Sequence, residues 1–399
     1  MRFHSFIIYH SSFIYYKMRV YFDNAATTPL IPEVISVMTD AMHRLNGNPS
    51  SIHADGRNVR AAIEEARKIV AQHIGAGIGE IFFTSGGTES NNMVLKNAVR
   101  DLGVTRIISS PIEHHAVLHT LENLQKHNNI RVELLSVDAL GRINLEELSQ
   151  KLVASKEKTL VTLMHSNNEI GTMIDLEAVA NICSQHHAYF HSDTVQTMGF
   201  YPIDVNKTPI HFLTGSAHKF HGPKGVGFVY INSNVSIKPF IDGGAQERNM
   251  RGGTENVHGI IGLGKALHYV YKNIEAHKAH ITALRSYFIQ QLQNDFEDIE
   301  FVGDINGNAH YKVLNVSFPP SPRAELLLFL LDMSGISASG GSACSSGAEG
   351  GSHVLNALNI HPDRKSIRFS FSHLNTQADV DFTIEKLKGL VAVRKSVLS

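Results

Sequence analysis

The sequence has only two cysteines, Cys183 and Cys344, in 399 residues, and it has no tryptophan. Two cysteines cannot form a disulfide framework, so packed side chains must hold the fold together, and we expect a reducing, cytoplasmic compartment. An excess of charge of one sign is also missing, because 36 Lys and Arg residues stand against 37 Asp and Glu residues. No global field therefore attracts phosphate, and we expect neither direct nucleic-acid binding nor binding to a membrane.

Long hydrophobic runs are missing as well. The apolar stretches are of strand length, so the sequence predicts no transmembrane helix. Residues 1–17 are rich in aromatic and apolar side chains, but Ser, His and Tyr interrupt them, and no small-residue cleavage site follows before Met18. We treat residues 1–17 as an extension that carries no information on function. Met18 is a second candidate for the start of the chain.

Between about residues 30 and 260, short β-branched runs alternate with helical patterns. Such alternation predicts an α/β fold in which helices cover both faces of a mainly parallel sheet, here of seven strands. Active sites in these sheets lie beyond the carboxyl ends of the strands. The expected strands are 81–84, 107–109, 132–137, 160–164, 188–191, 211–214 and 226–231, and the expected helices are 88–100, 113–127, 145–153 and 175–187.

A long polar helical stretch, about 256–295, predicts a connecting helix that leads to a smaller α+β domain. The expected strands there are 311–318, 336–339 and 366–371, and the expected helices are 323–333, 353–359 and 377–392. We therefore expect a large domain over residues 31–262 and a small C-terminal domain over residues 263–399. Residues 18–30 are assigned to a segment that associates with the small domain.

Lys219 lies after a predicted strand, among small residues and glycines in the stretch from Gly215 to Gly225. Covalent amine catalysis needs a neutral, positioned lysine in a partly desolvated site, and this environment is typical of one. Asp193 follows another predicted strand, where a carboxylate can pair with a protonated pyridine nitrogen. The competing interpretations are a solvated loop lysine and an aspartate that caps a helix.

A third element, residues 84–90 (TSGGTES), follows a strand and opens a helix. Glycines, a hydroxyl and free N–H groups at a helix N-terminus form a phosphate cradle, although Ser85 and Thr88 could be plain capping residues. The segment lacks the Gly-Lys-Ser/Thr of a Walker loop. A phosphate cradle, a strand-end aspartate and a lysine occur in this order along one parallel sheet. Together they predict a pyridoxal 5′-phosphate enzyme.

The two cysteines differ in their surroundings. Cys344 lies in a Gly- and Ser-rich loop over residues 339–351, where an exposed thiolate could act as a nucleophile. An incidental surface thiol is the alternative. Cys183 lies on a helical pattern and is expected to be a small buried apolar residue. No compact Cys/His ligand box predicts a metal site, although Cys344 could transiently ligate the iron of a nascent cluster.

These residues resemble the cysteine desulfurases of the class V aminotransferase type that supply sulfur for iron–sulfur clusters, and the likeness runs from about Val20 to the C-terminal helix. The motifs that carry it are residues 22–29 (FDNAATTP), 47–51 (GNPSS), 113–114 (EH), 167–171 (NNEIG), 250–254 (MRGGT) and 366–370 (SIRFS), with the Lys219 and Cys344 stretches. The resemblance implies the fold of the fold type I pyridoxal-phosphate-dependent transferases. It also implies transfer of sulfur from L-cysteine to Cys344 as a persulfide, with alanine as the second product.

The resemblance also implies roles for single residues. Lys219 would attach the cofactor covalently, His114 would stack on its ring and move protons, and Cys344 would take the sulfur. Asn168 and Arg368 would bind the substrate carboxylate. The other expected cofactor contacts are Gly87, Thr88, Asn168, Asp193, Gln196, Ser216 and His218, with Thr254 reaching the phosphate of the partner subunit in a homodimer. Small departures from the family pattern are Thr194 and Gly87, where alanine is usual, and Ala217, where glycine is usual.

The resemblance leaves some alternatives open. A selenocysteine lyase needs the same residues, whereas a small-amino-acid aminotransferase needs no loop cysteine, so Cys344 disfavours the aminotransferase. An inactive scaffold for cluster-assembly proteins would not need Lys219, Asp193 and Cys344 together. The sulfur acceptor is expected to be another protein, such as a cluster scaffold, and tRNA thiolation is a second possible use of the sulfur.

Overall fold

The computed structural model describes residues 19–341 and 351–393. Its largest sheet has seven strands in the order β2-β8-β7-β6-β5-β3-β4, and β8 alone runs antiparallel to its two neighbours. The prediction of a mainly parallel seven-stranded sheet is therefore confirmed. The strands are β2 (Ile81–Thr84), β3 (Arg106–Ser109), β4 (Arg131–Leu134), β5 (Thr159–Thr162), β6 (Tyr189–Asp193), β7 (Phe212–Ser216) and β8 (Gly227–Ile231).

Helices cover both faces of this sheet, as expected for strands that are apolar on both sides. One face, with Phe82, Ile107 and Phe212, packs against α3 and α4. The opposite face, with Phe83 and Leu213, packs against α2, α6 and α8. The helices of this region are α1 (Pro32–Arg44), α2 (Ala54–Ile74), α3 (Gly87–Leu102), α4 (His115–Asn128), α5 (Leu145–Val153), α6 (Leu176–Gln185), α7 (Gln246–Asn249) and α8 (Val257–Lys272), with short 3-10 turns at Ile78–Glu80 and Ala217–Lys219.

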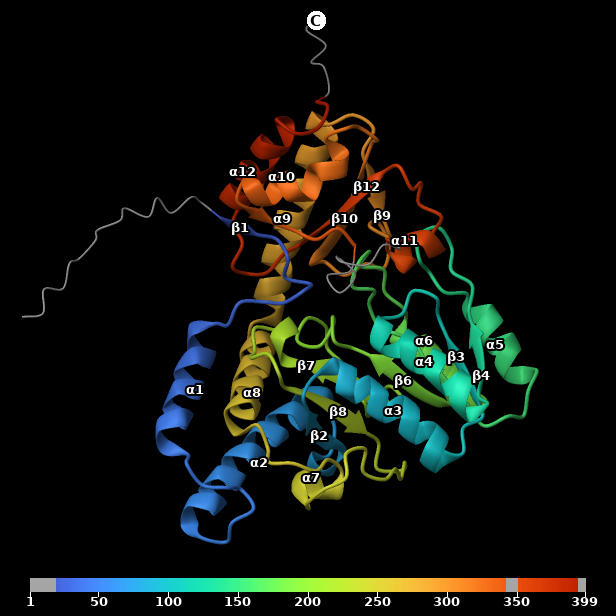
Figure 1. The fold of residues 1–399 in the computed structure, drawn as a ribbon, viewed down its shortest axis with the longest axis vertical. Helices are drawn as coiled ribbons and strands as arrows, with labels where there is room; N and C mark the ends of the chain where they lie inside the picture. Colours follow the sequence, from blue (N-terminus) through green and yellow to red (C-terminus); the bar gives the residue numbers. More distant parts are fainter. Residues whose placement is uncertain (1–18, 342–350, 394–399) are drawn as a thin grey trace, which may run out of the picture.

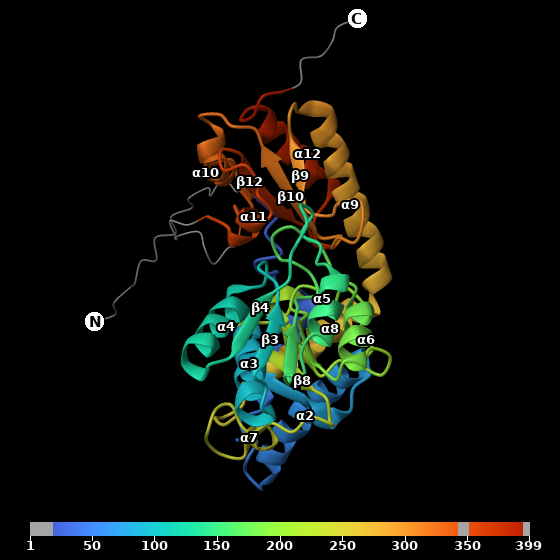
Figure 2. The ribbon, with the colours of Figure 1, turned by 90° about the vertical axis from the view of Figure 1, so that its right-hand side faces the viewer.

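The connecting helix predicted over 256–295 is two helices. Asn273 ends α8 and begins α9 (Ile274–Asp295), which rises from the large sheet to the smaller sheets (Figures 1 and 2). The smaller sheets are an antiparallel one, β12-β10-β9, and a parallel pair, β1-β11. Their strands are β1 (Val20–Tyr21), β9 (Glu300–Val302), β10 (Val313–Phe318), β11 (Ile336–Ser337) and β12 (Lys365–Ser370), and the remaining helices are α10 (Leu327–Met333), which follows a 3-10 turn at Ala324–Leu326, α11 (His353–Ala357) and α12 (Gln377–Lys388).

The N-terminal segment pairs with this C-terminal part of the chain, since Val20 and Tyr21 lie opposite Ile336 and Ser337. The predicted association of residues 18–30 with C-terminal elements is consistent with this pairing, while the exact domain boundaries stay a prediction. Four elements, α1, α2, α7 and β9, have no counterpart among the predictions. No helix in the described ranges is both long enough and apolar enough to cross a bilayer.

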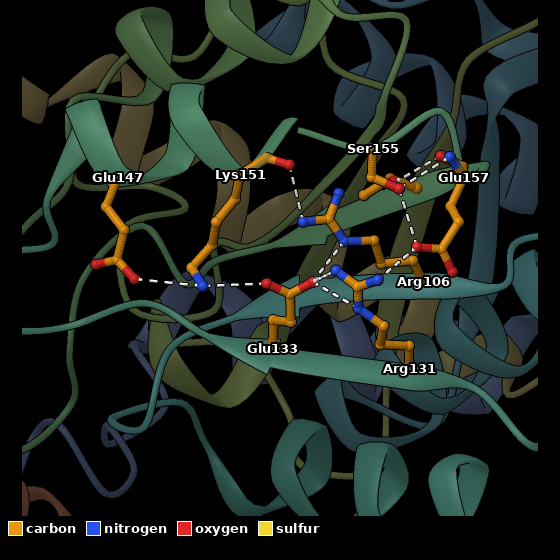
Figure 3. A network of polar contacts seen from close by, with 8 residues as sticks. Arg106, Arg131, Glu133, Glu147, Lys151, Ser155 and Glu157 are labelled. Atoms are coloured by element: carbon orange, nitrogen blue, oxygen red, sulfur yellow. Dashed lines mark hydrogen bonds and ion pairs between the residues drawn. The ribbon is translucent and has the colours of Figure 1, made fainter. Parts of the chain in front are cut away.

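A network of charges holds the outer edge of the large sheet (Figure 3). Glu133 on β4 accepts hydrogen bonds from Arg106 of β3, from Arg131 of its own strand and from Lys151 of α5, at 2.7, 2.6 and 3.0 Å. Burial alone would raise the pKa of the Glu133 carboxyl, but the three cations outweigh it and lower the pKa to about 2. Charged side chains on an outer strand also oppose unwanted pairing with a second chain.

Candidate active site

The predicted site residues meet in one cavity at the carboxyl ends of β6 and β7. Ten of the predicted residues line this cavity. They come from the helix α3, the N-cap of α4, the loop that follows β5, the strand β6 with the turn after it, the strand β7 with the 3-10 turn after it, and the strand β12. In parallel sheets, ligands generally bind beyond the carboxyl ends of the strands, and this cavity lies there. The cavity is lined by Ala25, Ala26, Gly87, Thr88, Asn91, His114, Met164, Asn168, Asp193, Val195, Gln196, Ser216, His218, Lys219 and Arg368.

Lys219 ends the 3-10 turn that follows β7, and its side chain is half-buried. Its Nζ donates hydrogen bonds to the carbonyl oxygens of Ala25 and Ala26, both at 2.8 Å. The N-terminal segment thus fixes the position of the amine. This is the arrangement that a nucleophilic lysine needs, because an amine that is held in place loses less entropy when it reacts.

Asp193 is the last residue of β6 rather than a residue beyond the strand, and its side chain is buried. One carboxylate oxygen accepts a hydrogen bond from the backbone N–H of Val195 at 2.9 Å. The other accepts one from Nδ2 of Asn91 on α3 at 2.6 Å. Two donors therefore set the orientation of the carboxylate within the cavity.

The predicted phosphate cradle forms the N-terminus of α3. Gly86 precedes the helix with φ 149°, a conformation that favours glycine. A Cβ atom on Gly87 would lie 2.8 Å from Cγ2 of Val195, so the absence of a side chain keeps the helix terminus close to the turn after β6. The first N–H groups of a helix have no partner within it and attract anions.

His218 lies at the same end of the cavity, where Nδ1 of its ring is 3.2 Å from Oγ1 of Thr27. Burial, with a contribution from Lys219, lowers the pKa of His218 to about 3. The imidazole is therefore neutral at physiological pH. Neutral His218 can offer a hydrogen bond to an anion, beside the backbone N–H groups at the start of α3.

His114 caps α4, and its Nδ1 accepts a hydrogen bond from the backbone N–H of Ala116 at 3.0 Å. Burial lowers the pKa of His114. In the neutral ring the proton therefore resides on Nε2, since the accepting Nδ1 must be bare. His114 is arranged to donate a proton or a hydrogen bond from Nε2.

Arg368 lies on β12 and is 1% exposed, so its guanidinium is buried rather than at the surface. Its Nη2 donates to Asp23 at 2.8 Å and its Nη1 to the carbonyl oxygen of Asn168 at 2.9 Å, whereas Nε has no partner among the residues that the structure describes. Because β12 belongs to a different sheet from Lys219, only the tertiary structure brings the two residues to one cavity.

One predicted residue that the structure describes, Thr254, lies apart from this cavity. Thr254 is exposed and lines a neighbouring cavity with Ser85 and Gly225. Cys344 lies outside the described residues. Cys183, on α6, is fully buried, and burial raises the pKa of its thiol to about 12, which confirms its interpretation as a core residue.

The cavity fits pyridoxal 5′-phosphate. A helix N-terminus for a phosphate, a fixed carboxylate for a pyridine nitrogen and an amine for an aldehyde all face one space. The side-chain oxygens of Gln196 and Asn91 are buried there without a hydrogen-bond partner in the described part of the chain. Such orphaned atoms are costly unless a ligand satisfies them.

The aminotransferase class-V family model matches residues 20–382. The chain belongs to this family. Its members are pyridoxal-phosphate-dependent enzymes, so the predicted cofactor and fold are confirmed. A cysteine desulfurase IscS from Dictyoglomus turgidum is 41% identical over 96% of both chains. A solved NifS-like protein is 36% identical, with a TM-score of 0.86, over 93% of this chain and 99% of the other. A structure described as SspA in complex with cysteine is 31% identical, with a TM-score of 0.78, over 90% of this chain and all of the other.

The family site contains groups that the sequence interpretation missed. Asn91 orients Asp193, and the carbonyl oxygens of Ala25 and Ala26 hold Lys219. Asn91 could have been found, because it lies four residues after Gly87 and therefore on the same face of the helix. The backbone carbonyls carry no sequence signal. Within residues 19–341 and 351–393, no three His, Cys, Asp or Glu side chains form a group that could hold a metal ion.

Proposed function

We propose that this protein is a cysteine desulfurase, which removes sulfur from L-cysteine and leaves alanine. The observation that carries the proposal is one cavity in which Lys219, Asp193 and Arg368 meet, together with a cysteine, Cys344, in a Gly- and Ser-rich stretch of the sequence. The similarity to proteins named cysteine desulfurase supports the same reaction. A transaminase would not need Cys344.

Pyridoxal 5′-phosphate, when bound, supplies an electron sink for negative charge that develops at the substrate α-carbon. Lys219 would hold it covalently, Asp193 and Gln196 would bind its ring, and the N-terminus of α3 with Ser216 and His218 would bind its phosphate. Two further lining residues, Asn168 and Arg368, would bind the substrate carboxylate, since a guanidinium matches a carboxylate with two parallel hydrogen bonds.

Proton transfer falls to Lys219 and His114. The Lys219 amine lies in the cavity and would take the α-proton of the substrate, and His114 would donate a proton from Nε2. The Cys344 thiolate attacks the substrate sulfur: an S–S bond forms, the substrate C–S bond breaks, and its electron pair remains on carbon, which is then protonated. The products are alanine and a persulfide on Cys344, which passes the sulfur to an acceptor protein.

The functional unit is proposed to be a cytoplasmic homodimer in which Thr254 of each subunit reaches the phosphate of the other. The exposure of Thr254 in the single chain supports this assignment. Sulfur acceptors such as a cluster scaffold are proposed as further partners. Residues 31–262 and 263–399 are proposed as the large and small domains.

The test is a desulfurase assay that quantifies both alanine and sulfide. Cys344→Ala should still bind the cofactor and show the spectral change on addition of cysteine, yet release no sulfide with a reductant. Cys183→Ala, the matched control at the buried cysteine, should keep its activity. Full sulfide release by Cys344→Ala would refute the proposal. A parallel assay with selenocysteine distinguishes a desulfurase from a selenocysteine lyase.

A further inference from the structure

The phosphate end of the active-site cavity continues into a second cavity. Between them lies a polar groove lined by the start of α3, including Gly87 and Glu89, and by Ser85 and Gly225. Ser85 and Gly225 also line the cavity that contains Arg251 and Thr254. The cradle of one site and the loop that carries Thr254 therefore share walls.

Glu89 in the first turn of α3 faces this groove. Its Oε2 accepts a hydrogen bond from the backbone N–H of Ser85 at 2.9 Å. Burial alone would raise the pKa of the Glu89 carboxyl, but hydrogen bonds from Arg251 and Ser85 outweigh it and lower the pKa. A helix N-terminus stabilises a carboxylate, yet a carboxylate beside a phosphate dianion repels it unless a cation compensates.

Arg251 supplies that cation. Its Nε lies 3.0 Å from Oε1 of Glu89, and its Nη2 lies 3.4 Å from Oε2. The side chain of Glu89 is 10% exposed and that of Arg251 is 24% exposed, so water screens the pair only in part. Arg251 thus ties the first turn of α3 to residues 250–254.

A second ion pair anchors the start of the same loop. Three consecutive residues of the short element α7, Glu247 to Asn249, have left-handed φ values of 45°, 56° and 65°, so α7 is not a regular helix. Such a conformation persists only when surrounding contacts impose it. The Glu247 carboxylate accepts two hydrogen bonds from Arg67, at 2.7 and 2.9 Å, and one from the backbone N–H of Phe83 on β2 at 2.7 Å. The segment 247–254 is therefore fixed to β2 through Glu247 and to α3 through Arg251, and these two elements flank the cradle.

We infer that Glu89 and Arg251 are positioning residues for the cofactor phosphate, a role that rests on the proposed cofactor-dependent function. Neither residue needs to touch the phosphate. Their pairing holds the first turn of α3 at the distance from Ser216 and Gly225 at which backbone N–H groups converge on one anion. The same ion pair fixes the position of residues 250–254, which include Thr254.

The experiment compares two cofactors on the full-length chain. Each protein is loaded either with pyridoxal 5′-phosphate or with pyridoxal, which lacks the phosphate, and release is followed by the loss of visible absorbance. We expect Glu89→Gln, Arg251→Gln and the double variant each to speed release of the phosphorylated cofactor by ~10-fold or more, the effect of losing a charged hydrogen bond. Release of pyridoxal should change by less than about twofold, because it does not use the cradle.

Two further variants complete the test. Arg251→Lys keeps the positive charge but loses the planar guanidinium. Its rate of release of pyridoxal 5′-phosphate should lie between the rates of wild type and Arg251→Gln. Arg142→Gln removes an arginine that pairs with Asp304, with Nε 2.8 Å from Oδ2, outside the active-site cavity, and should leave both release rates unchanged.

Three results would overturn the inference: unchanged release in both single variants, equal acceleration for both cofactors, or a double variant that returns to the wild-type rate. The last result would mean that net charge, not positioning, is what matters. If the wild-type chain held neither cofactor, the proposed function itself would fail instead.

Discussion

Lys219 and Gln196 donate hydrogen bonds to the same backbone oxygen, that of Ala25, at 2.8 and 2.9 Å. The two side chains lie on segments after different strands of the large sheet, whereas Ala25 belongs to the N-terminal segment that pairs with the C-terminal part of the chain. The site is thus assembled across the contact between the large sheet and the smaller ones. Within residues 19–341 and 351–393 the buried side-chain oxygen of Gln196 has no partner, so a ligand could satisfy it.

Replacement of Asn91 by Ala should impair the cofactor site without unfolding the chain. The change removes the 2.6 Å hydrogen bond that orients Asp193, and a hydrogen bond to a charged group is worth about 1.5–3 kcal/mol, or roughly 10- to 100-fold. The visible spectrum and its pH dependence should shift, and turnover of cysteine should fall. Asn97→Ala is the control, because Asn97 is equally buried on the same helix but bonds to the carbonyl oxygen of Lys238. An unaltered spectrum in Asn91→Ala would contradict the assigned role of Asn91.

Replacement of Arg368 by Gln should weaken cysteine binding while the cofactor is retained. Loss of a charged, bidentate partner of a carboxylate predicts a fall in kcat/KM of ~10- to 100-fold. Arg364→Gln is the matched control, since Arg364 immediately precedes β12, four residues before Arg368, and bonds to Ser317 and Asp298 rather than lining the cavity. Equal kinetic losses in the two variants would argue against a role of Arg368 in substrate binding.

Cys183 should resist thiol reagents at neutral pH. Its thiol is fully buried and its pKa is raised to about 12, so almost no thiolate is present or accessible. Mass spectrometry after iodoacetamide treatment should find Cys183 unmodified in the native protein and modified after unfolding in urea. Rapid native modification of Cys183 would show that α6 opens far more readily than its packing implies.

The protein should lose stability as the pH falls below about 6.5. His191 is completely buried between hydroxyls of Thr162 and Thr214, and burial lowers its pKa to about 3. The unfolded chain therefore binds a proton at this site below its unfolded pKa of about 6.5, whereas the folded chain does not until about pH 3. The contribution of His191 to the free energy of unfolding is fully present above pH 6.5. It declines between pH 6.5 and pH 3 by up to about 1.4 kcal/mol per pH unit.

Urea unfolding at pH 7.5, 6.0 and 5.0 measures this decline. His191→Gln should reduce the slope of unfolding free energy against pH. His361→Gln serves as the control, because the His361 side chain is 65% exposed. The same slope in His191→Gln and in wild type would disprove the contribution of His191.

Most strands and helices of the large sheet could be predicted from the sequence, because apolar runs between turn residues persist in the folded chain. The break at Asn273 could not, since the helical pattern runs through it and only the packing of α8 on α1 and α2 sets its end. The helix α2 escaped prediction even though Val59, Ile63 and Val70 follow helical spacing and are buried. The length of β6 was also underestimated, so that Asp193 proved to be part of the strand.

The sequence alone determined the chemistry of this protein. Lys219, Asp193 and the glycines at the start of α3 lie at or just beyond the carboxyl ends of strands of one sheet, and parallel strands bring such residues to one edge whatever the details of packing. The tertiary structure decided what no local pattern contains: that Asn91 orients Asp193, that carbonyl oxygens of the N-terminal segment hold Lys219, and that Arg368 is buried beside them. These contacts join residues far apart in the chain, so only the packing of the smaller sheets against the large one creates them.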